Sequence, residues 1–227
     1  MAAGLGTRLR PLTERWPKPV LPIDGRPVIA VLLRELAAAG LGRVWVVTGH
    51  LAEQVESLVG DGSAFGVAVR FVRQPEALGS ADAVQRALDD GAEPPLLVSA
   101  ADTVFSSGDV ARFAAAFERG DAVGAIGVRT EPGRESGRLA VRRDGERIVD
   151  LRQGDPDGLW TPAPLWGIRG EVAGRLRLDR PPYELGNAYQ AAIDAGEVVT
   201  AIEIGKTRDL TDPLDLVKEN FPYLRAR

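Results

Sequence analysis

The chain has 227 residues, 44% of them hydrophobic and 26% charged, which is ordinary for globular proteins and enough for one α/β domain with a core. Its formal net charge of −4 argues against a nucleic-acid-binding surface, so any site for anions must be local. The absence of cysteine excludes disulfides and thiolate metal sites, and the single histidine, His50, excludes a metal site built from several histidines.

The start of the chain is short for an α/β fold. Only Met1, Ala2 and Ala3 precede Gly4, whereas a glycine-rich turn in such a fold normally follows a full buried strand. We expect either that the numbering begins late, at a Met that ends this strand, or that the sheet contains a stub, and we favour the first. No signal peptide precedes the first motif and no apolar run reaches transmembrane length, so we expect a cytoplasmic protein that binds no membrane.

The next part of the chain alternates between helical and strand patterns. Apolar spacing predicts helices over 27–39, 51–59, 80–88 and 108–119, and strands over 43–48, 67–72, 95–101 and 122–128. Strands that alternate with helices are typical of a mainly parallel sheet with both faces covered.

The pattern changes after residue 129. Short strands are predicted over 138–141, 148–151 and 165–168, with a hairpin turn at Asp144-Gly145, so we expect an antiparallel lobe. Helices are then predicted over 171–176, 184–195 and 213–220, and a strand over 198–204. The last helix should be capped by Asp212, with Pro213 in its first position.

Residues 4–19 carry the pattern of a phosphate-binding loop. Gly4 and Gly6 allow close approaches and turns that a side chain would prevent, and Arg8 and Lys18 are among several nearby cations. From these residues alone, an ordinary basic surface loop remains an alternative. The loop is not a Walker A motif, because Gly-Lys-Ser/Thr is absent, and it is not a dinucleotide fingerprint, because Leu9 stands where the third glycine is required.

The longer string Gly-Leu-Gly-Thr-Arg-Leu-Arg-Pro-Leu-Thr at 4–13, followed by Pro-Lys-Pro at 17–19, closely resembles the signature of the sugar-1-phosphate nucleotidylyltransferases. This family includes glucose-1-phosphate thymidylyltransferase and mannose-1-phosphate guanylyltransferase. The resemblance implies a Rossmann-like three-layer α/β/α fold with a mainly parallel sheet and a small antiparallel acceptor lobe. It further implies one domain over 1–227, with a nucleotide-binding half at 1–128 and an acceptor-binding half at 129–227.

The resemblance also implies the activity. An acceptor such as a sugar 1-phosphate would attack the α-phosphate of a nucleoside triphosphate in line, assisted by Mg²⁺, to give an NDP-sugar and pyrophosphate. Arg8 would neutralise the β- and γ-phosphates, and Lys18 would lie near the α-phosphate. The alternative for Lys18 is a solvent-exposed lysine between two prolines. The loop residues expected to bind the nucleotide are Ala3, Gly4, Gly6, Thr7 and Arg8.

Residues 74–83 resemble the segment with which the family binds the base. Gln74 has a donor and an acceptor and could recognise the edge of a pyrimidine, which favours UTP or dTTP, and Gly79 would let the base lie against the backbone. The alternative is a plain strand–loop–helix connection in which Ser80 is the N-cap.

Two aspartates are candidate metal ligands. Asp102 ends an apolar strand, where ligands of α/β sheets gather, and a carboxylate suits Mg²⁺. The alternative for Asp102 is a turn residue that bonds its own backbone. By resemblance, Asp209 is the second ligand; Asp212 competes for this role, but the following Pro213 marks it as a helix cap.

The acceptor side departs most from the family pattern. Gln153 and Gly154 replace the Lys-Pro of a Glu-Lys-Pro motif, so Arg152 is the candidate for the acceptor phosphate, together with Glu184 and Asn187. Two alternatives therefore stay open beside the main hypothesis: the same chemistry on a non-standard phosphorylated acceptor, or a degenerate or regulatory nucleotide-binding subunit without turnover. A homo-oligomer is also left open, and His50 is expected to be a structural turn residue.

Overall fold

The computed structural model describes residues 1–129, 139–153 and 160–221, and the chain forms two compact units. Unit 1 contains Met1–Ala77, Ala100–Gly108 and the chain from Thr207 on; unit 2 contains Leu78–Ser99 and Asp109–Lys206. These units do not follow the expected halves 1–128 and 129–227, whose roles in binding remain a prediction. Among the described residues, no helix combines the length and apolar character needed to cross a bilayer.

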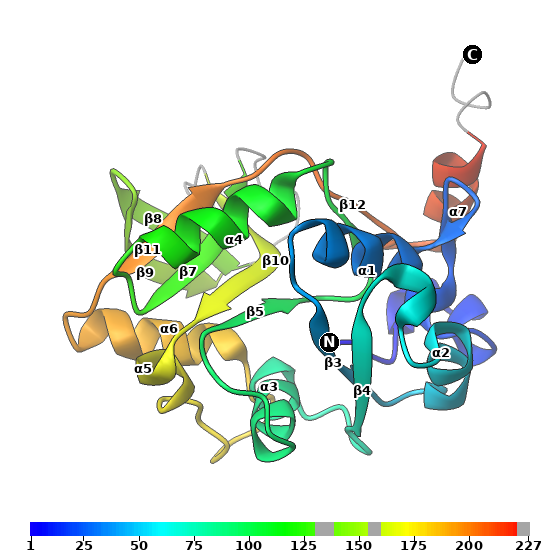
Figure 1. Ribbon diagram of the computed structural model, residues 1–227, viewed down its shortest axis with the longest axis horizontal. Coiled ribbons are helices and arrows are strands. Elements are labelled where there is room, and N and C mark those ends of the chain that lie inside the picture. Colours follow the sequence, from blue (N-terminus) through cyan, green and yellow to red (C-terminus); the bar gives the residue numbers. More distant parts are fainter. Residues whose placement is uncertain (130–138, 154–159, 222–227) are drawn as a thin grey trace. The chain divides into compact units, whose positions relative to one another are not determined.

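Unit 1 contains a pair of parallel strands with a helix before each. β3 (Arg43–Thr48) and β4 (Ala68–Arg73) pair from Arg43↔Ala68 to Thr48↔Arg73; α1 (Val28–Ala38) precedes β3 and α2 (Ala52–Val59) connects the strands (Figure 1). Ala2 forms a parallel bridge with Thr48, and its N–H donates to the Val47 carbonyl at 2.7 Å. Ala2 therefore adds one residue of parallel pairing beside β3.

The rest of unit 1 consists of short elements. β1 (Pro22–Ile23) pairs antiparallel with β2 (Arg26–Pro27), β6 (Thr103–Val104) pairs antiparallel with β12 (Arg208–Asp209), and α7 (Pro213–Asn220) follows. The predicted cap of α7 is confirmed, because the Asp212 carboxylate accepts from the Leu214 N–H at 2.8 Å. Leu9 of the opening loop, residues 4–21, packs in one apolar cluster with Leu21, Ile23, Val28 and Leu210. This cluster anchors the loop to α1 and to the segment after β12.

Unit 2 is built on a six-stranded sheet with the order β5-β10-β7-β11-β9-β8. Among its described strands, only β7 and β11 pair in parallel and the other pairs are antiparallel, so the sheet is mixed. The strands are β5 (Leu96–Ser99), β7 (Gly124–Arg129), β8 (Leu139–Asp144), β9 (Arg147–Gln153), β10 (Thr161–Ile168) and β11 (Val199–Glu203).

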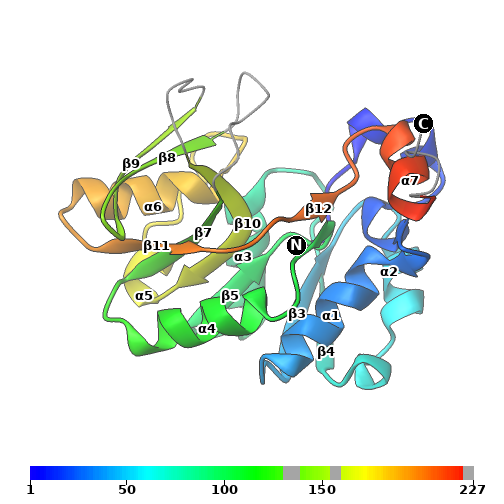
Figure 2. The same cartoon turned by 90° about the horizontal axis from the view of Figure 1, so that it is seen from above.

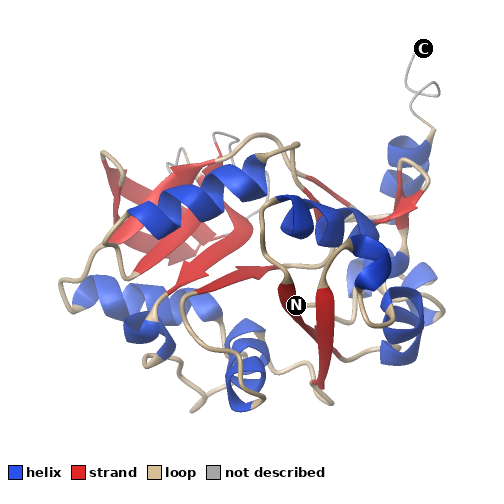
Figure 3. Ribbon diagram, in the orientation of Figure 1, coloured by secondary structure: helices blue, strands red, loops and turns tan. Residues whose placement is uncertain are grey.

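Helices cover both faces of this sheet. A Cβ on Gly167 of β10 would meet the Phe117 ring of α4 (Asp109–Arg119), whereas a Cβ on Gly124 of β7 would meet the Tyr189 ring of α6 (Leu185–Asp194). Because Gly167 pairs with Ala125, the neighbour of Gly124, these contacts lie on opposite faces. Figure 2 shows α4 and α6 on the two sides of the sheet, and Figure 3 shows the helices against its strands. Unit 2 also contains α3 (Ser80–Asp89) and α5 (Gly170–Ala173).

The α/β class expected from the sequence is confirmed, and the predicted helices and strands of residues 27–128 occur with small shifts at their ends. The hairpin at Asp144-Gly145 is also present, between β8 and β9. The strand predicted at 165–168 is longer and begins at Thr161, because a register shift between Pro162 and Trp166 accommodates the prolines. This strand lies between β5 and β7, so the antiparallel strands continue the sheet that contains β7.

Candidate functional site

Lys18 and Asp102 form an ion pair in unit 1. The Lys18 Nζ lies 2.6 Å from Asp102 Oδ2, and the two side chains are only 14% and 30% exposed. Lys18 is the first residue of a short 3₁₀ turn, Lys18–Val20, and its neighbours Pro17 and Pro19 are both buried. Lys18 is therefore held against a carboxylate and is not a solvent-exposed lysine.

Asp209 lies on a strand that pairs with the residues directly after Asp102. Asp209 on β12 is the Cα partner of Thr103 on β6, and Thr103 directly follows Asp102. Partners in an antiparallel pair have Cα atoms about 5 Å apart, so the backbone of Asp209 lies close to the residue that follows Asp102. The structure thus places the two aspartates that the sequence proposes as metal ligands on backbone segments that meet in unit 1.

The carboxylates have further partners nearby. Asp102 Oδ1 lies 3.4 Å from the Thr103 hydroxyl, and Asp209 Oδ2 lies 3.4 Å from the Thr211 hydroxyl. Among the described residues, no group of three or more His, Asp or Glu side chains could hold a metal. Two carboxylates nevertheless fit Mg²⁺, because this ion commonly uses one or two carboxylates and completes its shell with water and substrate phosphates.

Arg208, the residue before Asp209 on β12, forms ion pairs with two carboxylates. Its guanidinium contacts both carboxylate oxygens of Asp24, at 2.5 and 2.8 Å, and its Nε lies 2.6 Å from Glu219 Oε2. The hydrogen bonds from Arg208 lower the pKa of Asp24, and the hydrogen bond with Asp24 in turn raises the pKa of Arg208. Arg208 was not singled out from the sequence, since a single arginine before an aspartate gives no signal.

The opening loop leaves the sheet beside Asp102. The Ala101 N–H donates to the Met1 carbonyl at 2.8 Å, so the first residue of the chain contacts the residue before Asp102. Ala3 is buried, Gly4 is exposed and nothing lies within 4 Å of the place a Gly4 Cβ would occupy. The loop therefore begins with open space around its first glycine.

The next residues of the loop form a 3₁₀ turn, Thr7–Leu9, that is buried at one end and exposed at the other. Leu9 is buried in the apolar cluster, while Thr7 and Arg8 are exposed. The turn thus anchors one side chain in the core and presents the other two to the surface.

Gln74 follows β4 and is 4% exposed. Its N–H donates to the Thr48 carbonyl at 2.7 Å, which continues the pairing of β4 with β3 by one residue. Gln74 is thus placed at the carboxyl ends of these parallel strands, in the same unit as Lys18, Asp102 and Asp209.

Gly79 and Glu184 are brought together in unit 2. Gly79 has a φ of 115°, and a Cβ there would lie 2.5 Å from the Tyr183 carbonyl oxygen. The Tyr183 N–H donates to the Leu78 carbonyl and the Ala81 N–H donates to the Tyr183 carbonyl, both at 2.7 Å. Gly79 is therefore required by the close approach of the chain before α6, a long-range contact that the sequence does not reveal.

Ser80 does not act as the N-cap of α3. Gly79 occupies that position without a side-chain hydrogen bond. The Ser80 hydroxyl instead donates to Glu184 Oε2 at 2.9 Å and accepts from the Leu185 N–H at 2.8 Å, so it satisfies an N–H in the first turn of α6. The side chain of Glu184, an acceptor candidate, therefore contacts the segment after Gly79.

The other two candidates for binding the acceptor are Asn187 and Arg152. Asn187 is exposed in the first turn of α6, with its N–H donating to the Glu184 carbonyl at 3.1 Å. Arg152 pairs with Ala140 in the β8–β9 hairpin, but its side chain and Gly154 lie outside the described residues.

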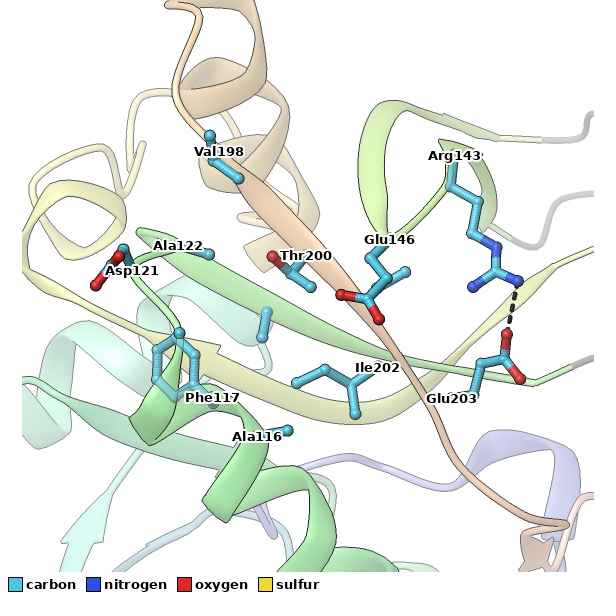
Figure 4. Close-up of a pocket in the computed structure, with 13 residues that line it drawn as sticks. Ala116, Phe117, Asp121, Ala122, Arg143, Glu146, Val198, Thr200, Ile202 and Glu203 are labelled. Atoms are coloured by element: carbon cyan, nitrogen blue, oxygen red, sulfur yellow. Dashed lines mark hydrogen bonds and ion pairs between the residues drawn. The ribbon is translucent and has the colours of Figure 1, made fainter.

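A cavity of about 480 Å³ in unit 2 contains none of these candidates. It lies between α4, β7, β11 and the β8–β9 turn, with Phe117 and Ile202 on its apolar side and an ion pair of 2.6 Å between Arg143 and Glu203 at one edge (Figure 4). Because none of the predicted site residues lines this cavity, it gives no independent support for the predicted site.

Comparisons of the chain with a family model and with individual proteins all identify nucleotidyltransferases. Residues 1–151 match the Nucleotidyl transferase family. The chain is 26% identical over 229 residues to the low-salt glycan biosynthesis nucleotidyltransferase Agl11 of Haloferax volcanii, and 29% identical over 231 residues to the glucose-1-phosphate thymidylyltransferase of Streptomyces griseus. Each alignment covers 97% of this chain but 64% of the relative, so the chain spans less than two thirds of the length of these relatives.

The fold is shared with a crystal structure of a putative glucose-1-phosphate thymidylyltransferase from Bacillus anthracis. The TM-score is 0.85 at 20% identity, with 96% of this chain and 91% of that chain covered. The match of residues 1–151 to the family confirms the resemblance of residues 4–19, and the chain belongs to the Nucleotidyl transferase family.

Proposed function

We propose that this protein is a nucleotidyltransferase that joins a nucleoside triphosphate to a phosphorylated acceptor of the sugar 1-phosphate type and releases pyrophosphate. The observation that supports this proposal is the 2.6 Å ion pair between Lys18 and Asp102, with Asp209 on the strand that pairs with the residues directly after Asp102. Family membership and the name of the Streptomyces griseus relative support the same reaction.

The reaction needs no protein nucleophile, because the acceptor phosphate is already anionic. Its oxygen attacks the α-phosphorus, and the bond from this phosphorus to the bridging oxygen of pyrophosphate breaks. Lys18 supplies positive charge at the α-phosphate and the exposed Arg8 supplies it at the departing phosphates. Asp102 and Asp209 would hold Mg²⁺, which neutralises phosphate charge when bound.

The nucleotide proposed is UTP or dTTP. Gln74 supports this choice, because its amide can both donate to and accept from a pyrimidine edge. The name of the thymidylyltransferase relative supports it as well. Ala3, Gly4, Gly6 and Thr7 would bind the phosphates and Gly79 the base, while Arg152, Glu184 and Asn187 would bind the acceptor. The cytoplasmic location also remains a prediction.

A panel of nucleoside triphosphates against sugar 1-phosphates and other phosphorylated acceptors, with Mg²⁺, tests the proposal through pyrophosphate release and product mass. We expect turnover with UTP or dTTP. Turnover with acceptors other than sugar 1-phosphates would favour the alternative acceptor that the missing Lys-Pro pair suggests. Nucleotide binding without turnover for every acceptor would favour a regulatory subunit, and no binding of any nucleotide would refute the proposal.

A further inference from the structure

The opening loop has no long helix or strand to fix its shape. Between residues 4 and 21 it consists of three short 3₁₀ turns, so side-chain contacts supplement the backbone hydrogen bonds within these turns. We propose that His50 is a positioning residue for this loop and that it acts through Thr13 on the peptide between Gly6 and Thr7. The inference rests on the function proposed above, because that function places the triphosphate at this loop.

The first link joins Thr13 to Gly6. Thr13 is 1% exposed, and its hydroxyl donates to the Gly6 carbonyl at 2.9 Å, which also accepts from the Leu9 N–H at 2.9 Å. Gly6 has a φ of 62°, and a Cβ on it would lie 2.8 Å from the Thr13 methyl group. Both the hydrogen bond and the close packing therefore fix the Gly6 carbonyl toward Thr13.

This orientation determines where the next N–H points. In a planar trans peptide, the carbonyl and the N–H point in opposite directions. Since the Gly6 carbonyl is held by Thr13, the Thr7 N–H must point away from Thr13. Thr7 itself is exposed, so the fixed peptide directs a backbone donor toward the side of the loop where phosphates would bind.

The second link joins His50 to Thr13. His50 Nε2 lies 2.6 Å from the Thr13 carbonyl oxygen, and since a carbonyl can only accept, Nε2 carries the hydrogen. The turn that presents His50 is tightly constrained. A Cβ on Gly49 would lie 2.9 Å from the carbonyl oxygens of Ala3 and Gln74, and Leu51 has a φ of 51°, which is unusual for leucine. A turn held this firmly gives the imidazole a defined position.

The same region offers a matched control. Gln54 of α2 follows His50 along the chain, and its Nε2 donates to the Arg15 carbonyl of the opening loop at 2.7 Å. Unlike the His50 contact, this bond does not reach the residue whose side chain holds Gly6. Its loss should therefore leave the Gly6 peptide in place.

Hydrogen–deuterium exchange of the protein without nucleotide tests the positioning role. In His50→Leu, which removes the donor and keeps volume, exchange of the peptide covering residues 4–12 should rise about five- to tenfold. His50→Gln, whose amide nitrogen can donate at a similar reach, should restore wild-type exchange, and Gln54→Ala should leave it unchanged. Equal effects of His50→Leu and Gln54→Ala, failure of His50→Gln to restore, or global unfolding of His50→Leu would overturn the proposal.

A double-mutant cycle tests the path through Thr13. Thr13→Val keeps the shape and removes the hydroxyl, so it should weaken UTP binding about five- to tenfold, as His50→Leu does, and the double variant should be no weaker than either single variant. Additive losses would show that the two residues act independently and would overturn the path. If the wild-type protein does not bind UTP, the same cycle is measured with dTTP; if it binds neither, the proposed nucleotide is wrong, and additivity is measured on the exchange of residues 4–12.

Discussion

The Lys18 ammonium lies 2.6 Å from the Asp102 carboxylate, although the two residues come from opposite ends of the first half of the chain. The pair joins a cation proposed to act at the α-phosphate with a carboxylate proposed to hold Mg²⁺. With these side chains 14% and 30% exposed, the pair is partly shielded from water, so its charges interact more strongly than those of a surface pair.

Replacing Lys18 should remove catalysis more than it removes nucleotide binding. Lys18→Ala is expected to lower kcat by about 100-fold or more, the usual cost of losing one group that stabilises transition-state charge. Steady-state kinetics with UTP or dTTP check this. Lys218→Ala is the matched control, because Lys218 pairs with Asp215 at 3.3 Å on the exposed helix α7 and should give wild-type rates. Wild-type kcat in Lys18→Ala would contradict the role given to this lysine.

Asp209 and Asp212 allow the metal assignment to be tested within one short segment. Asp209→Asn removes a charged ligand, so the Mg²⁺ concentration that gives half-maximal activity should rise about tenfold or more. Asp212→Asn should leave the Mg²⁺ dependence unchanged, because asparagine also caps a helix. Titration of activity against Mg²⁺ distinguishes the two variants. The opposite order of effects would transfer the metal role to Asp212.

The contact between Arg208 and Asp24 predicts a dependence of stability on pH. Hydrogen bonding to Arg208 lowers the pKa of Asp24, so the contact stabilises the folded state above the unfolded pKa of about 3.9, and this contribution is lost as the pH falls through the lower, folded pKa. Since the Asp24 side chain is 60% exposed, the contribution should be at most about 1 kcal/mol.

Urea unfolding of the wild-type protein and Asp24→Asn measures this difference. The wild type should be the more stable protein at about pH 7, and the difference should vanish near pH 2. A difference that is constant across this range would mean that the carboxylate charge of Asp24 does not contribute.

Gly79 should tolerate no side chain. Gly79→Ala would place a Cβ 2.5 Å from the Tyr183 carbonyl oxygen at a φ of 115°, so we expect a loss of at least about 2 kcal/mol in the free energy of unfolding. Gly170→Ala is the control in the same unit, since nothing lies within 4 Å of its Cβ position. Thermal or urea unfolding checks both variants. Equal stabilities would show that the Tyr183 segment moves aside easily.

Much of the fold was predictable because local patterns carry it. The period of apolar residues predicts α1, β3, α4 and β7 directly, since each buries one face or both faces along a continuous run. β10 was predicted only in part, because Pro162 and Pro164 argue against a strand, and only the register shift within the sheet makes room for them.

The sequence by itself determined the family and the residue types of the proposed site, because residues 4–19 carry an unusually long local pattern. Only the tertiary structure decided which residues meet: Asp209 pairs with Thr103, the residue after Asp102, Ser80 contacts Glu184, and His50 contacts Thr13. The physical reason is that these contacts join segments far apart in the chain, and the packing of the strands and helices between them, which no local pattern records, sets their distances.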